Sequence, residues 1–123
     1  MIEIAEQEFN IDAEKIIIVG ESNGGMMAYY LAGKTKARYY MPVYGSPPFG
    51  SYPSVKKEDA LFNFFDRSDD LVPLDGGVNR EGNVYTSDQE QIDHWSEAQD
   101  CDISEPMEVI ETPRSGGIYN VES

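Results

Sequence analysis

KIIIVGESNG, at residues 15–24, is the stretch that decides the fold. It begins with four β-branched residues in a row that end at Gly20, which predicts a strand buried on both faces, as in a parallel sheet covered by helices. The spacing then becomes helical, because Met27, Tyr30 and Leu31 share one face and are expected to pack in the core. The stretch therefore predicts a buried strand, a tight turn and a helix in succession.

The remaining chain continues this alternation on both sides. Residues 2–9 have the spacing of the end of an amphipathic helix, and residues 37–44 and 60–65 have strand character. Residues 47–53 are rich in proline and predict a loop, and residues 107–111 are a further candidate strand. This order of elements predicts an α/β fold with a parallel sheet flanked by helices.

Two helix boundaries can be placed from local signals. Gly33 is a suitable C-terminal stop for the helix that follows the turn. Thr86 or Ser87 can cap a second helix that runs to about Ala98, with Glu90 at the capping-box position.

The composition excludes several classes of partner. The chain has 123 residues, which allows one domain, and its 9 Lys and Arg against 23 Asp and Glu give a formal net charge of −14. Such a surface repels nucleic-acid phosphates and anionic membranes, so neither is an expected partner. Cys101 is the only cysteine, which excludes a Cys-based zinc cluster, and the acidic segment 68–70 lacks calcium-loop spacing. No metal is expected.

Gly20, Ser22 and Gly24 form the pattern G-x-S-x-G at the predicted strand–helix junction. In this pattern the serine sits on a strained turn that lifts its hydroxyl above the sheet, and the flanking glycines let strand and helix approach. The backbone N–H of Asn23 then points to where an oxyanion would develop. The motif predicts a serine nucleophile, and the alternative is a plain glycine-rich turn between strand and helix, with or without a role in phosphate binding.

A serine nucleophile needs a base, and the base needs an orienting carboxylate. The acidic turn after the third predicted strand is the place for that carboxylate, and the pattern does not choose between Asp66, Asp69 and Asp70. His94 is the only histidine and follows in the correct order. It falls inside a predicted helix, whereas a catalytic histidine is expected on a loop after a strand, so we interpret His94 as structural.

Several segments match one family pattern. GESNGGMMAYYLA at residues 20–32 is similar to G-x-S-N-G-G-M-M-A-Y-x-L-A, and IDAEKI at residues 11–16 is similar to I-D-P-x-R-V. DDLVPLDGG at residues 69–77 is similar to D-P-x-V-P-Y-x-G-G, and Trp95 with Cys101 fits a W-x5-C helix end. Over this range the chain resembles the polyhydroxybutyrate depolymerase and feruloyl esterase family of α/β-hydrolases.

The resemblance implies the central-to-C-terminal portion of an α/β-hydrolase fold. It implies Ser22 as nucleophile, Asp69 as triad acid and Asn23 as a backbone oxyanion donor. The implied activity is that of a serine carboxylic-ester hydrolase that forms an acyl-enzyme on a small or polymeric ester, without metal or organic cofactor. A secreted location is suggested by the family alone.

The chain departs from this family pattern in three places. Phe65 and Asp66 stand where the family has His-Gly, and the sequence has neither the G-G-H-x-W-P-like segment of the catalytic histidine nor the early His-Gly-type loop. We therefore expect residues 1–123 to be a partial hydrolase domain, with no second domain and with sheet edges that allow self-association. The alternative function is a catalytically incomplete fragment or a non-enzymatic interaction module on a hydrolase scaffold.

Overall fold

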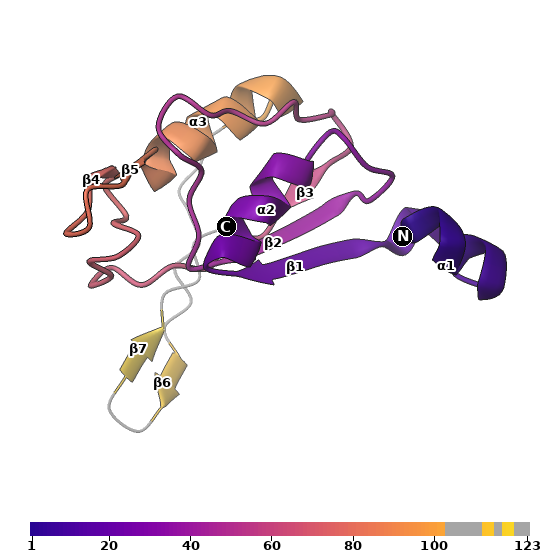
Figure 1. The fold of residues 1–123 in the computed structure, drawn as a ribbon, viewed down its shortest axis with the longest axis horizontal. Helices are drawn as coiled ribbons and strands as arrows, with labels where there is room; N and C mark the ends of the chain where they lie inside the picture. The colour runs from indigo at the N-terminus through magenta and orange to yellow at the C-terminus, as the bar shows by residue number, and fades with distance from the viewer. Residues whose placement is uncertain (103–111, 115–116, 120–123) are drawn as a thin grey trace.

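The computed structural model describes residues 1–102, 112–114 and 117–119 and has an α/β organisation (Figure 1). In chain order its elements are α1 (Ile2–Glu8), η1 (Ala13–Lys15), β1 (Ile17–Glu21), α2 (Asn23–Leu31), β2 (Tyr39–Val43), β3 (Ala60–Leu61), β4 (Gly77–Val78), β5 (Val84–Tyr85), α3 (Asp88–Gln99), β6 (Thr112–Arg114) and β7 (Gly117–Tyr119). None of the helices in the described ranges combines the length and apolar character that a bilayer-spanning helix needs. The candidate strand at residues 107–111 lies outside the described residues.

The central sheet has the strand order β1-β2-β3, and both pairs are parallel, as predicted. Ile18 pairs with Tyr40, Tyr40 pairs with Leu61, and an isolated bridge between Val43 and Phe64 continues the second pair. Because all three strands run in one direction, the segments that follow them meet at the same edge of the sheet. The antiparallel hairpin of β4 and β5 was not predicted, because its strands have only two residues each.

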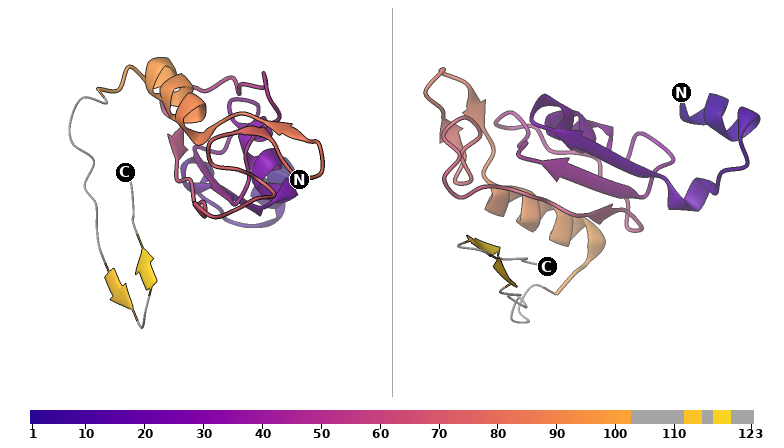
Figure 2. Two further views of the ribbon diagram at one scale, coloured as in Figure 1. Left: turned by 90° about the vertical axis from the view of Figure 1, so that its left-hand side faces the viewer. Right: turned by 90° about the horizontal axis from the view of Figure 1, so that it is seen from below.

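The core lies on one face of this sheet, between the strands and two helices (Figures 1 and 2). Tyr29 of α2, Tyr40 of β2 and Trp95 of α3 are buried together with Ala32 and Ala37. The rings of Tyr40 and Trp95 meet edge to face, with centroids 6.1 Å apart. Tyr29 and Trp95 thus bring α2 and α3 to one shared core, in which α2 packs against β1 and β2 and α3 lies on the β3 side of the sheet (Figure 1).

The prediction that the first strand is buried on both faces is wrong. Ile18 packs against the core, but Ile17 and Val19 are 55% and 62% exposed on the opposite face. The reason is that the core cluster lies on the Ile18 face of the sheet only, and β1 is an edge strand of the sheet within the described residues. Self-association through the edges of the sheet stays a prediction, and the exposed edge of β1 is one place where it could occur.

The prediction of which face of the helix packs in the core is also wrong in part. Ala28 and Tyr29 are the buried residues in the middle of α2, while Met27 and Tyr30 are exposed. Tyr29 packs in the core cluster, and the small buried residues Gly25 and Ala28 let the helix backbone lie close to the strands. Gly33, with a φ of 72°, follows the end of α2 as predicted, since glycine adopts this left-handed conformation at little cost.

Helix α3 begins with the predicted capping box, and Ser87 is its N-cap. The Ser87 Oγ accepts a hydrogen bond from the Glu90 N–H at 3.1 Å, and the Glu90 carboxylate accepts one from the Ser87 N–H at 2.8 Å. The backbone and side-chain hydrogen bonds from Ser87 hold the pKa of Glu90 below its ordinary value. This cap fixes the position of Asp88, the first residue of the helix.

Candidate active site

Ser22 occupies a strained turn between β1 and α2. Its backbone has φ 52° and ψ −114°, which lies in a left-handed region that non-glycine residues rarely adopt. The Ser22 N–H donates a hydrogen bond to the Val43 carbonyl at 2.8 Å, so the turn is tied to the end of β2. Its side chain is exposed and makes no capping hydrogen bond to α2. The turn therefore presents a hydroxyl that has no structural role at the helix terminus.

Close contacts between glycine backbones hold this turn. A Cβ added at Gly20 would lie 2.0 Å from the carbonyl oxygen of Gly24, whereas a Cβ added at Gly24 would meet nothing within 4 Å. The close approach of strand and helix therefore requires glycine at position 20 but not at position 24. A Cβ at Gly45 would lie 2.7 Å from the Ser22 carbonyl oxygen and 2.8 Å from the Cα of Gly25. Sequence reasoning missed Gly25 and Gly45, although a glycine directly after a predicted strand was a usable signal.

Tyr44 is a second strained residue at this edge of the sheet. It follows β2 with a φ of 50°, and its N–H donates to the Phe64 carbonyl at 2.8 Å. A left-handed conformation is an outlier for a bulky side chain and often marks a functional site. Tyr44 is exposed and lines a pocket beside the elbow. In the sequence, only the position of Tyr44 between a predicted strand and Gly45 could have indicated this conformation.

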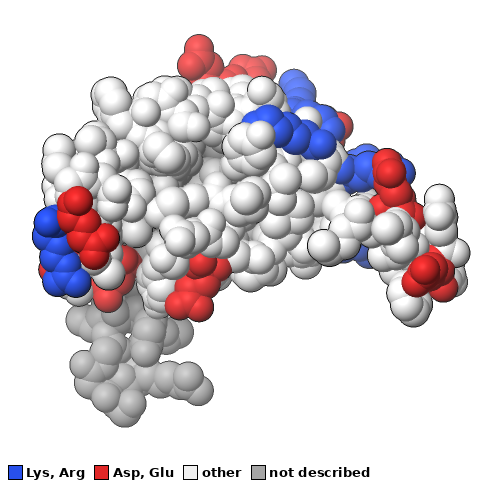
Figure 3. Space-filling model, viewed as in Figure 1, with Lys and Arg blue, Asp and Glu red and all other residues white. Residues whose placement is uncertain are grey.

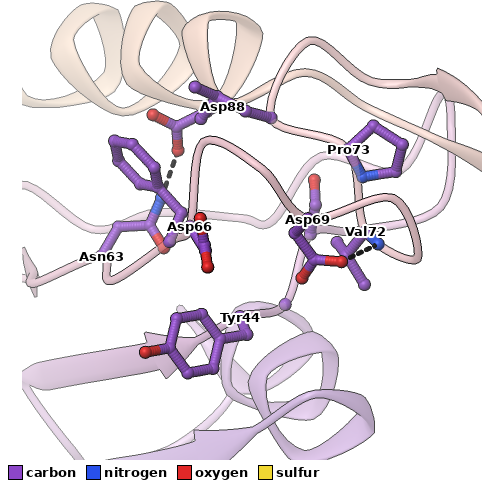
Figure 4. A pocket seen from close by; sticks show the side chains of 11 residues that line it. Tyr44, Asn63, Asp66, Asp69, Val72, Pro73 and Asp88 are labelled. Carbon is purple, nitrogen blue, oxygen red and sulfur yellow. Dashed lines mark hydrogen bonds between the residues drawn. The ribbon is translucent and has the colours of Figure 1, made fainter.

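That pocket, here called the acidic pocket, has a volume of about 20 Å³. It is lined by Tyr44, Asn63 and three carboxylates, those of Asp66, Asp69 and Asp88 (Figure 4). The Asn63 amide donates a hydrogen bond to Asp88, and its own oxygen is buried without a partner among the described residues. In the part of the chain that the structure describes, no three His, Cys, Asp or Glu side chains are placed to hold a metal ion.

Two of the candidate acids have local partners. Asp70 pairs with Arg80 at 3.2 Å and does not line the acidic pocket. Asp66 lines it, and its Oδ1 accepts hydrogen bonds from the Ser68 N–H at 2.8 Å and from the Ser68 hydroxyl at 2.7 Å. These hydrogen bonds lower the pKa of Asp66. The structure thus separates Asp70 from the other two carboxylates.

Asp69 is half-buried and held by the backbone of its own loop. Its Oδ1 accepts hydrogen bonds from the N–H groups of Leu71 at 2.8 Å and Val72 at 3.0 Å, and its Oδ2 has no hydrogen-bond partner among the described residues (Figure 4). Gly45 lines the same pocket and packs against the Ser22 backbone. The structure brings Ser22 and Asp69 to one edge of the sheet, and no hydrogen bond between described residues joins them.

His94 lies in the middle of α3, away from these residues. Its Nε2 is 2.7 Å from the Pro53 carbonyl oxygen, and its ring packs against Tyr52 with centroids 5.2 Å apart. The imidazole is therefore engaged with the proline-rich loop. Among the described residues, no hydrogen bond joins His94 to Ser22 or Asp69.

A larger hollow, here called the α2 groove, runs along the exposed side of α2. It has a volume of about 270 Å³ and lies between the helix and the proline-rich loop. Its lining residues are Asn23, Met26, Met27, Tyr29, Tyr30, Lys34, Pro47, Pro48, Ser51, Tyr52 and Pro53. The view onto α2 shows a centre without Asp or Glu, with charged side chains toward the border (Figure 3). Because Asn23 follows Ser22, the groove begins at the elbow.

Comparison with known proteins gives one match. The family model of the prolyl oligopeptidase family, a family of α/β-hydrolases, matches residues 1–98. No curated protein and no solved structure matches the chain significantly. The matched range includes the elbow, the parallel sheet, the acidic turn and most of α3. The predicted α/β-hydrolase fold is thereby confirmed, and the chain belongs to the prolyl oligopeptidase family.

Proposed function

We propose that this chain carries the nucleophile and the acid of a serine hydrolase that cleaves carboxylic esters through an acyl-enzyme. The observation that carries the proposal is the backbone of Ser22, held in a left-handed turn with an exposed hydroxyl at the start of α2. Such strain persists only where the surrounding structure imposes it, and it is the conformation that a nucleophile elbow requires. Membership of an α/β-hydrolase family supports the same chemistry.

In the proposed reaction, the Ser22 Oγ attacks the ester carbonyl carbon while an imidazole accepts the hydroxyl proton. The oxyanion accepts a hydrogen bond from the Asn23 N–H, where the helix N-terminus adds partial positive charge. Collapse of the intermediate breaks the bond to the alcohol, which takes the proton from the imidazolium and leaves an acyl group on Ser22. A water molecule then releases the acid by the reverse sequence of proton transfers.

Asp69 is proposed to orient that imidazole. Two backbone N–H groups fix its Oδ1, and its Oδ2 remains able to accept the imidazole N–H. A carboxylate held in this way keeps its orientation without a charged partner, which suits a group that must stabilise an imidazolium. Asp66 is the alternative, because it lines the same pocket.

The imidazole is proposed to come from outside these 123 residues, because His94 is the only histidine and is bound to the Pro53 carbonyl. Residues 1–123 are then part of a hydrolase domain. The early His-Gly-type loop supplies the second oxyanion donor in the family that the chain resembles. The chain alone is expected to be slow, since loss of one such donor costs about 10²–10³ in rate. A non-catalytic interaction module on the same scaffold is the alternative.

Peptide bonds are a second candidate substrate, because the matched family is a family of peptidases by name. The resemblance of residues 20–32 and 69–77 to the polyhydroxybutyrate depolymerase and feruloyl esterase pattern favours esters. A 4-nitrophenyl ester and a 4-nitroanilide of the same acyl group separate the two. Turnover of the ester alone supports an esterase, and comparable turnover of both supports a peptidase.

The test of the proposal is hydrolysis of 4-nitrophenyl acetate with added imidazole by the wild type and by Ser22→Ala. The wild type is expected to exceed the variant, and the difference is expected to grow with imidazole concentration. His94→Gln is the matched control and should behave as the wild type. Equal rates for the wild type and Ser22→Ala at every imidazole concentration would contradict the proposal.

A further inference from the structure

We propose that the α2 groove binds an acyl chain with an apolar body and an anionic far end, the acyl part of a dicarboxylic half-ester. The proposal rests on the proposed function in one respect, because it places the ester carbonyl at Asn23. Binding itself requires no catalysis and can be measured separately.

The charges of the groove point to an anion. Although the chain has 23 Asp and Glu residues, the described residues that line the groove include no Asp or Glu, and Lys34 is the one charged side chain among them. The Lys34 ammonium donates a hydrogen bond to the Tyr30 carbonyl at 2.9 Å and lies 3.6 Å from the centre of the Tyr30 ring. An ammonium has three donors, so this contact positions the charge and leaves donors for a ligand carboxylate.

The walls between Asn23 and Lys34 point to an apolar body. Met27 and Tyr30 are 53% and 59% exposed, and Tyr52 of the proline-rich loop, which is 46% exposed, lines the same groove. Methionine side chains adapt to ligands of irregular shape, and aromatic rings supply large apolar contact surfaces. A volume of about 270 Å³ is near the lower limit of typical ligand pockets and suits a single acyl chain.

The length of the ligand follows from the helix. Asn23 and Tyr30 are seven residues apart in α2, which corresponds to roughly 10 Å at the helical rise. The carbonyl and the carboxylate of an extended suberic acid half-ester are separated by a similar distance. Monomethyl suberate is therefore the matching probe, and methyl octanoate is its neutral counterpart with the same apolar body.

Methionine methyl NMR of the Ser22→Ala variant tests the proposal, because this background prevents hydrolysis of either probe. Monomethyl suberate is expected to shift the methyl signals of Met26 and Met27 in a saturable manner. Met41 lies in β2 and does not line the groove, so its signal should stay unchanged. Absence of saturable shifts at Met26 and Met27, or equal shifts at Met41, would overturn the proposal.

Charge recognition is tested by Lys34→Gln, with Lys57→Gln as the matched control outside the groove. Lys34→Gln is expected to weaken monomethyl suberate binding about threefold, as for an exposed ion pair, and to leave methyl octanoate binding unchanged. Lys57→Gln should change neither. Equal affinities of the two probes for the parent protein, unaffected by Lys34→Gln, would overturn the assignment of an anionic end.

The outcomes separate this proposal from the proposed function. Saturable shifts at Met26 and Met27, together with absence of Ser22-dependent hydrolysis in the wild type, would retain the groove and reject the esterase. Ser22-dependent hydrolysis without these shifts would retain the esterase and reject the groove as its acyl site.

Discussion

The acidic pocket and the α2 groove lie beside the same elbow, but their chemistry is opposite. The acidic pocket has a volume of about 20 Å³ and three carboxylates in its wall, whereas the groove has a volume of about 270 Å³ and no carboxylate among the described residues of its wall. Gly45, which packs against the Ser22 backbone, lines the acidic pocket, and Asn23 lines the α2 groove. The difference fits the division of roles proposed above, with charge stabilisation on one side of the serine and ligand binding on the other.

The two hollows also differ in how their walls are held. Backbone N–H groups of the acidic turn bind Asp66 and Asp69, and Asn63 binds Asp88, so the acidic pocket has directional bonds. The α2 groove is walled mainly by methionine, tyrosine and proline side chains. Directional bonds suit a site that orients an imidazole, and adaptable apolar walls suit a site that accepts a substrate.

The largest expected effect is at the elbow that separates the two hollows. Gly20→Ala places a Cβ 2.0 Å from a backbone oxygen that cannot rotate away, so the loss of unfolding free energy should reach or exceed the upper end of overpacking, about 3 kcal/mol. Gly24→Ala is the matched control and should change it by less than about 1 kcal/mol, since nothing obstructs that Cβ. Urea denaturation of both variants measures the contrast, and equal stabilities would contradict it.

The next effect distinguishes carboxylates inside and outside the acidic pocket. Asp69→Asn should lower the Ser22-dependent, imidazole-assisted rate about tenfold or more, because the amide no longer stabilises an imidazolium. Asp70→Asn removes a carboxylate that pairs with Arg80 at the surface, and the rate should change by less than about twofold. Initial rates with 4-nitrophenyl acetate measure both. A larger effect at Asp70 would remove Asp69 from the site.

A smaller effect concerns the helix that places Asp88 in the acidic pocket. Ser87→Ala removes the N-cap of α3 and should reduce the free energy of unfolding by about 1 kcal/mol. Ser96→Ala, inside the same helix, is the matched control and should be neutral or slightly stabilising. Thermal and urea unfolding provide the measurement. Equal losses in the two variants would show that the cap does not hold this end of the helix.

The smallest expected effect is a pH dependence of stability that arises from Glu90 in the same capping box. The lowered pKa of Glu90 means that its contribution to stability is present above the ordinary glutamate pKa and is lost as pH falls through the lowered value. The melting temperature of Glu90→Gln should therefore lie below that of the wild type near neutral pH, and the two should converge in acid.

Glu97→Gln is the control for this pH dependence, because Glu97 lies in the last turn of α3. A carboxylate near a helix C-terminus is unfavourable, so this variant should have the opposite sign near neutral pH. A difference at Glu90 that persists unchanged in acid would contradict the account of the cap.

Local patterns predicted the parts of the fold that depend on neighbouring residues. The β-branched run before Gly20, the capping box at Ser87 and the stop at Gly33 each depend on a few adjacent side chains, and all three appear in the structure. The exposure of Ile17 and Val19 was not predictable, because it depends on which elements cover each face of the sheet.

The site shows the same limit of sequence reasoning. The strained turn at Ser22 follows from a local motif, whereas the left-handed Tyr44 depends on contacts with the end of a neighbouring strand. The sequence pattern alone left Asp66, Asp69 and Asp70 open. Only the spatial arrangement separates Asp70, because its partner Arg80 lies in a hairpin that the sequence did not predict.

The most direct test of the account is to locate the acyl group itself. The wild type is treated with 4-nitrophenyl acetate and imidazole, stopped in acid, digested and mapped by mass spectrometry. The account predicts acetylation of Ser22 well above that of Ser46 and Ser51, and loss of this adduct in Ser22→Ala. Acetylation of Ser22 no greater than that of the other serines would contradict it.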